Sequence, residues 1–341
     1  MLNALSYYQC VAQGLGPLLF PQRLSHGTYS AEETQRMKAV CVHNIQLQTQ
    51  MMDVLERAWK ALEKAEIPTV VLKGVGLAAL YDDPSLRSWG DIDLFVGKKN
   101  YHPACAVMRK TFPEALKFDE ELEHYKHYNL IADGVSIELH RISASLSHPR
   151  DIRRYQRMEE EGMKHACELK IGELLLRIPE PTFNALFVFL HSWEHMITAG
   201  ANLRQLYDLR MVLHRYHAQI DAKRLKRYLQ QLCLLDSWQL YSYIMVQYLE
   251  LSQNEALFYN PQVAQRAERL FEDLLAGRMN TPHAQTQAPK NRFARKWYTM
   301  QERMKNARRI SLYSPSCARH MRAGIWLSGL RRLFAKDRHW E

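Results

Sequence analysis

The chain has 341 residues, 47% of them hydrophobic and 24% charged, which is ordinary for a soluble globular protein and allows two domains with separate cores. No apolar run approaches the roughly 20 residues of a membrane-spanning helix, and the N-terminus lacks the basic start and apolar centre of a secretory signal. The formal net charge is +10, but residues 290–341 hold 14 Lys and Arg against 3 acids, so this segment carries +11 and the rest carries −1. A general nucleic-acid-binding surface on the rest of the chain is therefore not expected.

The N-terminal segment, residues 1–66, is predicted to be helical. Residues 1–29 contain several glycines and prolines, which predict one short helix and a loop. Ser30 and Glu33 have the spacing of a capping box, so a long helix is expected to begin there and to run to the end of the segment. Its expected buried stripe consists of Val40, Ile45, Leu47, Met51, Val54, Leu55, Ala58 and Leu62.

The segment that follows has the pattern of a phosphate-binding turn. Residues 69–72, Thr-Val-Val-Leu, form a short apolar run rich in β-branched residues, which predicts a buried strand. Lys73 and Gly74 come next, and the apolar spacing then changes to that of a helix. A strand that passes through a glycine into a helix leaves free backbone N–H groups, which favour phosphate, and Lys73 adds a positive charge beside them.

Residues 91–96, Asp-Ile-Asp-Leu-Phe-Val, predict a second strand. Alternate residues of a strand share a face, so Asp91 and Asp93 point one way while Ile92 and Leu94 point into the core. Two carboxylates held this close repel each other, and a divalent cation removes the repulsion. Together with the phosphate-binding turn, this pair predicts chemistry on a nucleoside triphosphate.

The order strand, glycine turn, helix and Asp-x-Asp strand resembles the polymerase-β-like nucleotidyltransferase superfamily. Over about residues 54–213 the chain is similar to its uncharacterised bacterial nucleotidyltransferase branch. The residues that carry the similarity are Leu72, Lys73, Gly74, Tyr81, Arg87 and the run Asp91-Ile92-Asp93-Leu94. The chain differs at the turn, where Lys73-Gly74-Val75-Gly76 replaces the usual Gly-Ser or Gly-Gly.

The resemblance implies a third carboxylate on a later strand. Glu138 fits this position because it alternates with apolar Ile137 and Leu139, although the superfamily more often has aspartate there. The resemblance further implies that Asp91, Asp93 and Glu138 hold two Mg²⁺ ions and catalyse transfer of a nucleoside monophosphate from a nucleoside triphosphate, such as ATP, to a hydroxyl-bearing acceptor. The alternative for Glu138 is a solvent-facing residue on an edge strand.

Lys73, Gly74 and Arg87 are expected to bind the triphosphate. Other roles are common for such residues. A lysine at the end of a strand is often solvated, and Arg87 could instead stack on the indole of Trp89.

The middle of the chain completes the expected sheet. Residues 124–133 and 135–141 alternate like two strands, and Asp133-Gly134 between them is a strong hairpin signal. Residues 151–165 predict a helix, and residues 169–178 a short pair of strands.

Beyond residue 181 every segment has helical periodicity: 182–199, 202–217, 221–233, 236–251, 261–276, 291–310 and 316–336. We therefore expect an α+β fold with a mixed-sheet nucleotidyltransferase core, an N-terminal helix and a C-terminal helical domain. The expected divisions are an N-terminal helical segment, 1–66; the α/β core, 67–178; a helical domain lining the cleft, 179–280; and a linker with basic helices, 281–341.

The last expected helix carries an apolar stripe of Trp326, Leu327, Leu330, Leu333 and Phe334, flanked by basic residues. A basic amphipathic helix can bind a membrane surface or an acidic partner. Packing of the stripe on its own domain is the more common arrangement and is expected here.

Two groups in the helical region are candidates for the acceptor side of the site. His191, Glu194 and His195 have the order H-x-x-E-H found in a class of zinc hydrolases, which offers an alternative function. Otherwise these histidines face the acceptor or are buried with partners. Arg204 and Asp208, to which the family resemblance extends, have the i, i+4 spacing of a helical ion pair.

Six cysteines without a CxxC pair predict reduced thiols and a cytoplasmic protein. The expected partners are the nucleoside triphosphate and an acceptor that the sequence does not identify. A non-catalytic nucleotide-binding protein is the remaining alternative.

Overall fold

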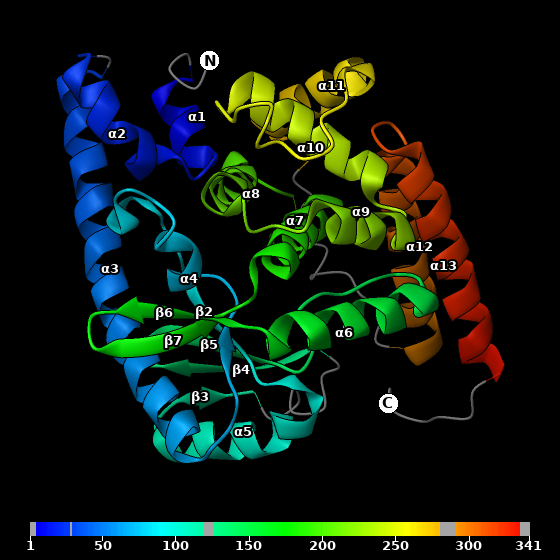
Figure 1. The fold of residues 1–341 in the computed structure, drawn as a ribbon, viewed down its shortest axis with the longest axis horizontal. Helices are drawn as coiled ribbons and strands as arrows, with labels where there is room; N and C mark the ends of the chain where they lie inside the picture. The colour runs from blue at the N-terminus through cyan, green and yellow to red at the C-terminus, as the bar shows by residue number, and fades with distance from the viewer. Residues whose placement is uncertain (1–4, 28, 119–125, 199, 280–290, 335–341) are drawn as a thin grey trace. The chain divides into compact units, whose positions relative to one another are not determined.

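The computed structural model describes residues 5–27, 29–118, 126–198, 200–279 and 291–334 (Figure 1). The chain forms two compact units. Unit 1 comprises Met1–Ser143 and Glu159–Asn184, and unit 2 comprises Ala144–Met158 and Ala185–Glu341. The elements combine a mixed sheet with many helices, as expected for the α+β class. None of the helices within the described residues combines the length and apolar character needed to span a bilayer.

Unit 1 is built on a five-stranded sheet with the order β1-β2-β5-β4-β3. Strands β2 and β5 are parallel, and the other neighbours are antiparallel. A hairpin of β6 and β7 forms a separate two-stranded sheet, and β7 contacts β1. The strands have the bounds β1 Val70–Val71, β2 Asp91–Phe95, β3 Leu116–Lys117, β4 His127–Ala132, β5 Val135–His140, β6 Cys167–Ile171 and β7 Leu174–Ile178. All of them were expected except the short edge strand β3, which was not predicted.

The turn between β4 and β5 is the predicted two-residue hairpin. Asp133 has a φ of 52° and Gly134 a φ of 76°. Positive φ at both central residues is the conformation that matches the natural twist of paired strands, and Asp-Gly adopts it readily. This turn fixes which residues of β4 lie opposite those of β5.

One face of the sheet forms the core of unit 1. Its side chains alternate along β2, β4 and β5 and are at most 2% exposed: Ile92, Leu94, Tyr128, Leu130, Ile137 and Leu139. Helices α3 (Ala31–Lys64) and α5 (Gly97–Thr111) contact each other and β5, and α3 also contacts β2. The opposite face of the same strands therefore carries their polar side chains.

Helix α3 begins as predicted, with both hydrogen bonds of the Ser30–Glu33 capping box. The expected stripe is correct from Met51 onward, and Leu47 is partly buried against the same core, but Val40 and Ile45 are wrong because they are exposed. Met37 and Asn44 are buried there instead, since they continue the heptad spacing that leads to Met51 and Ala58. The apolar pattern alone therefore predicted the wrong buried positions near the start of α3.

The N-terminal segment holds two short helices before α3, where one was expected. Helix α1 (Tyr7–Ala12) has its own capping box between Ser6 and Gln9. Helix α2 (Gly16–Ser25) has Pro17 in its first turn, where the fixed φ of proline suits a helix.

Unit 2 is helical, as the periodicity predicted. Its helices are the first part of α6 (Pro149–Lys164), most of α7 (Pro181–Thr198), α8 (Leu203–Tyr216), α9 (Ala222–Gln231), α10 (Leu235–Tyr248), α11 (Ala264–Leu275), α12 (Arg292–Ile310) and α13 (Pro315–Phe334). Arg309 of α12 donates hydrogen bonds to the carbonyls of Met196 and Ile197 at the end of α7. Helix α12 is thus packed within this unit, whereas the linker expected at the start of the segment 281–341 lies outside the described residues.

The expected packing of the apolar stripe on α13 is wrong at its first two positions. Trp326 is 55% exposed and Leu327 45% exposed. The buried face is instead formed by Cys317, Ala318, Met321, Gly324 and Ile325. Gly324 lies so close to His148 that an added Cβ would be 2.8 Å from the His148 Cα, so this glycine faces the packed side of the helix. The side chains of Leu330, Leu333 and Phe334 lie outside the described residues.

Candidate active site

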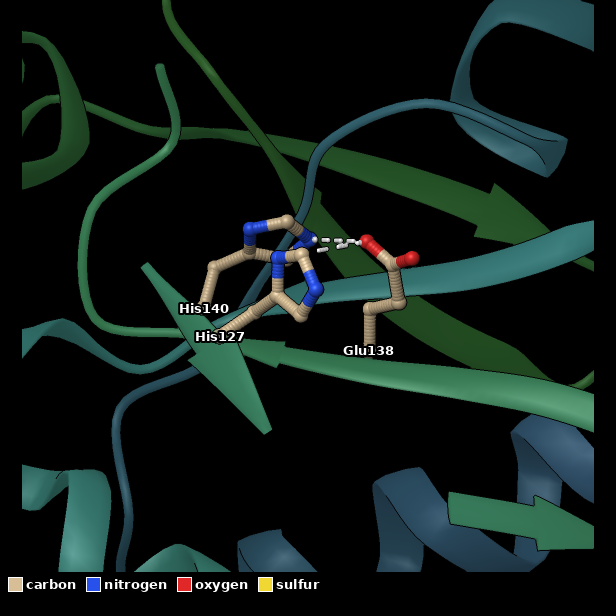
Figure 2. A group of neighbouring side chains, drawn as sticks. All are labelled: His127, Glu138 and His140. Atoms are coloured by element: carbon tan, nitrogen blue, oxygen red, sulfur yellow. Dashed lines mark ion pairs between the residues drawn. The ribbon is translucent and has the colours of Figure 1, made fainter. Parts of the chain in front are cut away.

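The polar face of the sheet gathers titratable side chains from three neighbouring strands. The parallel register pairs Asp93 of β2 with Glu138 of β5, and the antiparallel register pairs His140 of β5 with His127 of β4. Residues paired in register project to the same face of a sheet. Figure 2 shows the two imidazoles beside the Glu138 carboxylate. Because β5 lies between β2 and β4, Glu138 is on an inner strand and not at the edge of the sheet.

The three expected carboxylates come together. Asp91, Asp93 and Glu138 each offer an oxygen within 4.8 Å of the others. Asp93 is 1% exposed, whereas the side chain of Asp91 is 41% exposed. Oxygen atoms at this spacing are the donors that Mg²⁺ prefers, so the group fits a divalent cation.

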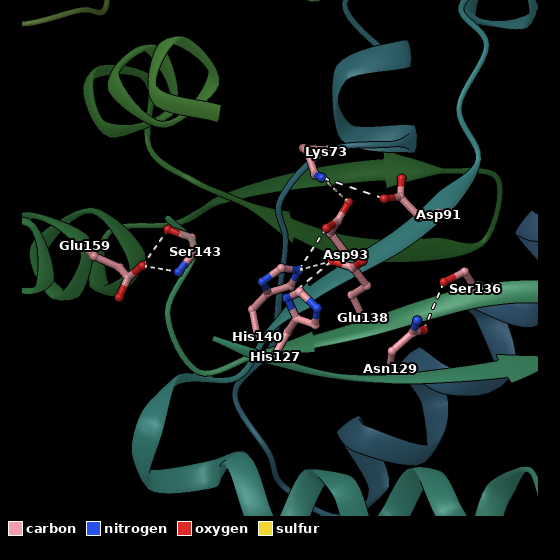
Figure 3. A network of polar contacts seen from close by, with 10 residues as sticks. All are labelled: Lys73, Asp91, Asp93, His127, Asn129, Ser136, Glu138, His140, Ser143 and Glu159. Atoms are coloured by element: carbon pink, nitrogen blue, oxygen red, sulfur yellow. Dashed lines mark hydrogen bonds and ion pairs between the residues drawn. The ribbon is translucent and has the colours of Figure 1, made fainter. Parts of the chain in front are cut away.

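Lys73 faces these carboxylates. Its Nζ lies 2.9 Å from Asp93 Oδ2 and 3.8 Å from Asp91 Oδ2 (Figure 3). Burial lowers the pKa of Lys73, but the charges of Asp93 and Asp91 outweigh it and raise that pKa above its ordinary value. The lysine is therefore ionised, and it is not a solvated residue at the end of a strand.

The network also contains His140, which sequence reasoning missed. Its Nε2 lies 2.8 Å from Asp93 Oδ1 and 3.2 Å from Glu138 Oε2. Burial lowers the pKa of His140, but its hydrogen bonds to the two carboxylates raise it overall. Burial in turn raises the pKa of Asp93, and Lys73 and His140 together hold it well below its usual range. Asp93 is thus an ionised carboxylate between the Lys73 ammonium group and the His140 imidazole.

His127 was also missed, and its Nδ1 lies 3.7 Å from Glu138 Oε2. A signal for both histidines was present in the sequence. Alternation along 135–140 puts His140 on the same face as Glu138, and the Asp133-Gly134 turn fixes His127 opposite His140.

The turn after β1 requires a glycine. Gly74 has a φ of 52° and a ψ of −119°, which residues with a Cβ rarely adopt. An added Cβ would also lie 2.9 Å from Cε3 of Trp89. The helix that follows, α4 (Val75–Ala78), is a single turn, much shorter than the spacing suggested.

Arg87 supports this turn from within the protein. It is 4% exposed, and its Nη1 donates to the carbonyl of Gly74 at 3.0 Å. Gln48 of α3 donates to the carbonyls of Ser85 and Arg87, and Asn44 donates to Ser85 as well. Asn44 and Gln48 thus lie on the side of α3 that faces the protein, and their hydrogen bonds hold the segment that carries Arg87.

Glu159 lies in unit 1 near this network, and its carboxylate accepts hydrogen bonds from the backbone N and the Oγ of Ser143 (Figure 3). Burial raises the pKa of Glu159 to about 7, although the bonds from Ser143 oppose the shift. The folded state therefore binds this proton more tightly than the unfolded state. The resulting stability is fully present below the unfolded pKa and is lost as the pH rises through about 7.

We expect Glu159→Gln to remove this pH dependence. Between pH 4 and pH 8 the free energy of unfolding of the wild type should fall by about 3 kcal/mol relative to the variant, at 1.36 kcal/mol per pKa unit. Urea unfolding across this range measures the difference. Glu168→Gln, at an exposed position on β6, is the control and should follow the wild type. Parallel pH profiles for Glu159→Gln and the wild type would contradict the prediction.

The residues of the H-x-x-E-H run lie on α7 in unit 2. The rings of His191 and His195 meet edge to face at 4.5 Å, and Glu194 Oε2 accepts from the backbone N of Ser145. Three groups of potential metal ligands occur among the described residues, and none contains these three side chains. The structure therefore offers no support for the zinc hydrolase alternative.

Arg204 and Asp208 lie on α8. Arg204 is half-buried and Asp208 is 4% exposed. A role for these two residues, or for the histidines of α7, on the acceptor side stays a prediction.

Two of the comparisons with known proteins gave a match. A family model described as uncharacterised nucleotidyltransferase matches residues 5–250. Among solved structures, an antigenic nucleotidyltransferase-like protein from Paracoccidioides brasiliensis is 15% identical with a TM-score of 0.37, covering 63% of this chain and 94% of that one. No curated protein matched. Because the family match spans well over half of the sequence, the chain belongs to this family of uncharacterised nucleotidyltransferases.

Proposed function

We propose that this nucleotidyltransferase moves a nucleoside monophosphate from a nucleoside triphosphate to a hydroxyl-bearing acceptor, a small molecule or a protein, with the help of Mg²⁺. The observation that supports this most directly is the convergence of Asp91, Asp93 and Glu138 on one face of adjacent parallel strands. Oxygen donors alone make up this group, which suits Mg²⁺. When bound, Mg²⁺ neutralises the triphosphate and polarises the reacting oxygens.

The residues of the chain have distinct roles in this proposal. The oxygen of the acceptor hydroxyl attacks the α-phosphorus, and pyrophosphate leaves. Glu138 accepts the proton that this hydroxyl loses. Asp93 is kept ionised by Lys73 and His140, so its oxygens can bind a cation at any physiological pH. Lys73 places a positive charge beside Asp91, which is the more exposed end of the group and the end where a triphosphate would meet it.

The proposed reaction is tested with each of four nucleoside triphosphates, labelled in separate samples at the α- or the γ-phosphate. The full chain is incubated with Mg²⁺ and with fractions of small molecules and proteins as acceptors. The α-label should move to an acceptor while the γ-label leaves as pyrophosphate, and EDTA should stop both. Transfer of the γ-label, or of neither label from any of the four, would overturn the proposal.

Lys73 and Arg87 are expected to contribute to triphosphate binding. Lys73→Ala removes a charge-assisted contact, and Arg87→Ala removes the support of the Gly74 carbonyl. Each change should weaken binding by about 1–3 kcal/mol, or roughly 5- to 150-fold. Calorimetry with a non-hydrolysable nucleoside triphosphate gives the affinity, and thermal unfolding shows whether each variant is folded.

Lys60→Ala is the matched control for these variants. This lysine lies on α3, is 63% exposed and pairs with Glu56. Its replacement should leave nucleotide affinity unchanged. Wild-type affinity in folded Lys73→Ala protein would place that lysine outside the nucleotide site.

A further inference from the structure

The two ends of the carboxylate group differ in their donor atoms. At the Asp91 end the potential ligands are oxygens, with Lys73 beside them. At the Glu138 end two imidazoles join the carboxylate, so that His127, Glu138 and His140 form a second group of potential ligands. Glu138 belongs to both groups. This mixed set of nitrogen and oxygen donors is not explained by a purely Mg²⁺-dependent site, because Mg²⁺ takes oxygen ligands.

The spacing of these donors suits one ion. His140 Nε2 lies 2.8 Å from Asp93 Oδ1 and 3.2 Å from Glu138 Oε2, and Glu138 Oε2 lies 3.7 Å from His127 Nδ1. Atoms that share an ion at bond lengths near 2.1 Å lie about 3.0–3.5 Å from one another. His127, Glu138 and His140 each offer an atom within 4.8 Å of the others, so small side-chain shifts are enough to bring these three atoms onto one ion, with the Asp93 carboxylate beside His140.

The orientation of the two imidazole rings also allows their nitrogen lone pairs to point toward one ion. The planes of His127 and His140 meet at 62°, with ring centres 5.2 Å apart (Figure 2). The lone pair of an imidazole nitrogen lies in the plane of its ring, so inclined rings can direct their lone pairs to one point. A second His–Asp–His group, His148, Asp151 and His320, lacks this property because its rings are stacked at 16°.

We propose that His127, Glu138 and His140, with Asp93, form a site for a divalent first-row transition-metal ion, which binds there in preference to Mg²⁺. Imidazole nitrogen is a favourable ligand for such ions and a poor one for Mg²⁺. The site lies where the proposed reaction needs the acceptor hydroxyl to be activated. The proposal rests on the proposed function for the role of the ion, but not for its binding.

Binding is measured without nucleotide on the full chain after removal of metals with a chelator. Mn²⁺ is the probe, because its free ion has a strong electron paramagnetic resonance signal that disappears on binding. We expect one Mn²⁺ per chain at this site, retained in about a hundredfold excess of Mg²⁺. Electron spin-echo modulation should show coupling of the bound ion to imidazole nitrogen.

Two histidine variants assign the ligands. His127→Gln and His140→Gln should each weaken Mn²⁺ binding about tenfold or more and reduce the nitrogen coupling. His127 is the safer change, because its side chain is 22% exposed whereas that of His140 is 3% exposed. His43→Gln, which removes an exposed histidine of α3, is the control and should bind Mn²⁺ like the wild type.

The outcomes separate this inference from the proposed function. Wild-type Mn²⁺ affinity in folded His127→Gln protein, absence of nitrogen coupling, or displacement of Mn²⁺ by equal Mg²⁺ would overturn the transition-metal site. Histidine-dependent Mn²⁺ binding supports the metal site whether or not labelled nucleotide is transferred. Absence of nucleotide transfer would overturn only the proposed reaction.

Discussion

Replacing Asp93 by asparagine is expected to abolish nucleotidyl transfer while leaving the protein folded. Asp93 is buried between Lys73 and His140 and shares the ligand group with Asp91 and Glu138. Asparagine keeps the shape of the side chain but removes the charge that a divalent cation requires. The loss of several kcal/mol of electrostatic stabilisation corresponds to a fall in turnover of about 10³-fold or more.

The measurement is transfer of the α-label under saturating nucleotide, together with the unfolding curve of the variant. Asp53→Asn is the control, because Asp53 lies on α3 with a side chain 72% exposed. It should retain full activity. Transfer at the wild-type rate by folded Asp93→Asn protein would remove the carboxylate group from the mechanism.

Replacing Gly74 by alanine is expected to damage both stability and activity. The Cβ would meet Trp89 at 2.9 Å, and the backbone conformation is one that alanine avoids. Strain and overpacking together should lower the free energy of unfolding by about 3 kcal/mol or more. The turn also holds Lys73 and receives the hydrogen bond of Arg87, so nucleotide binding should fall as well.

Gly172→Ala separates the two causes. Gly172 lies in the turn between β6 and β7 with a φ of 58°, and an added Cβ there would meet nothing within 4 Å. Only backbone strain is introduced, and the cost should be about 1–2 kcal/mol. Equal losses in the two variants, measured by urea unfolding, would show that the approach of Trp89 to Gly74 is unimportant.

Local pattern in the sequence was enough to predict most of the strands and the faces on which the carboxylates lie, while the choice of Glu138 as the third carboxylate came from the family resemblance. Alternation places Asp91 and Asp93 on one face of β2 and Glu138 on one face of β5, and the structure brings these faces together. The glycine turn and the hairpin were predictable for a similar reason, since each depends on the conformational freedom of a few neighbouring residues.

The missing parts of the site depend on contacts between distant segments. His140 acquires its role only because the parallel pairing sets Asp93 beside it, and the sequence does not state that pairing. Lys73 was predicted at the phosphate-binding turn, but its ion pairs with Asp91 and Asp93 form only when β1 pairs with β2. The burial of Asn44 on α3 was missed for the same reason, because its hydrogen-bond partner is the carbonyl of Ser85 in a distant segment.

The strand order also has a consequence for the order of folding. The hairpin of β4 and β5 is closed by a two-residue turn and can form on its own within about 1–10 μs, whereas the parallel pairing of β2 with β5 must close a long loop. We therefore expect the hairpin to form early, carrying His127, Glu138 and His140, and Asp91 and Asp93 to join when β2 adds to it. Until that step the proposed site lacks both of the carboxylates that β2 contributes.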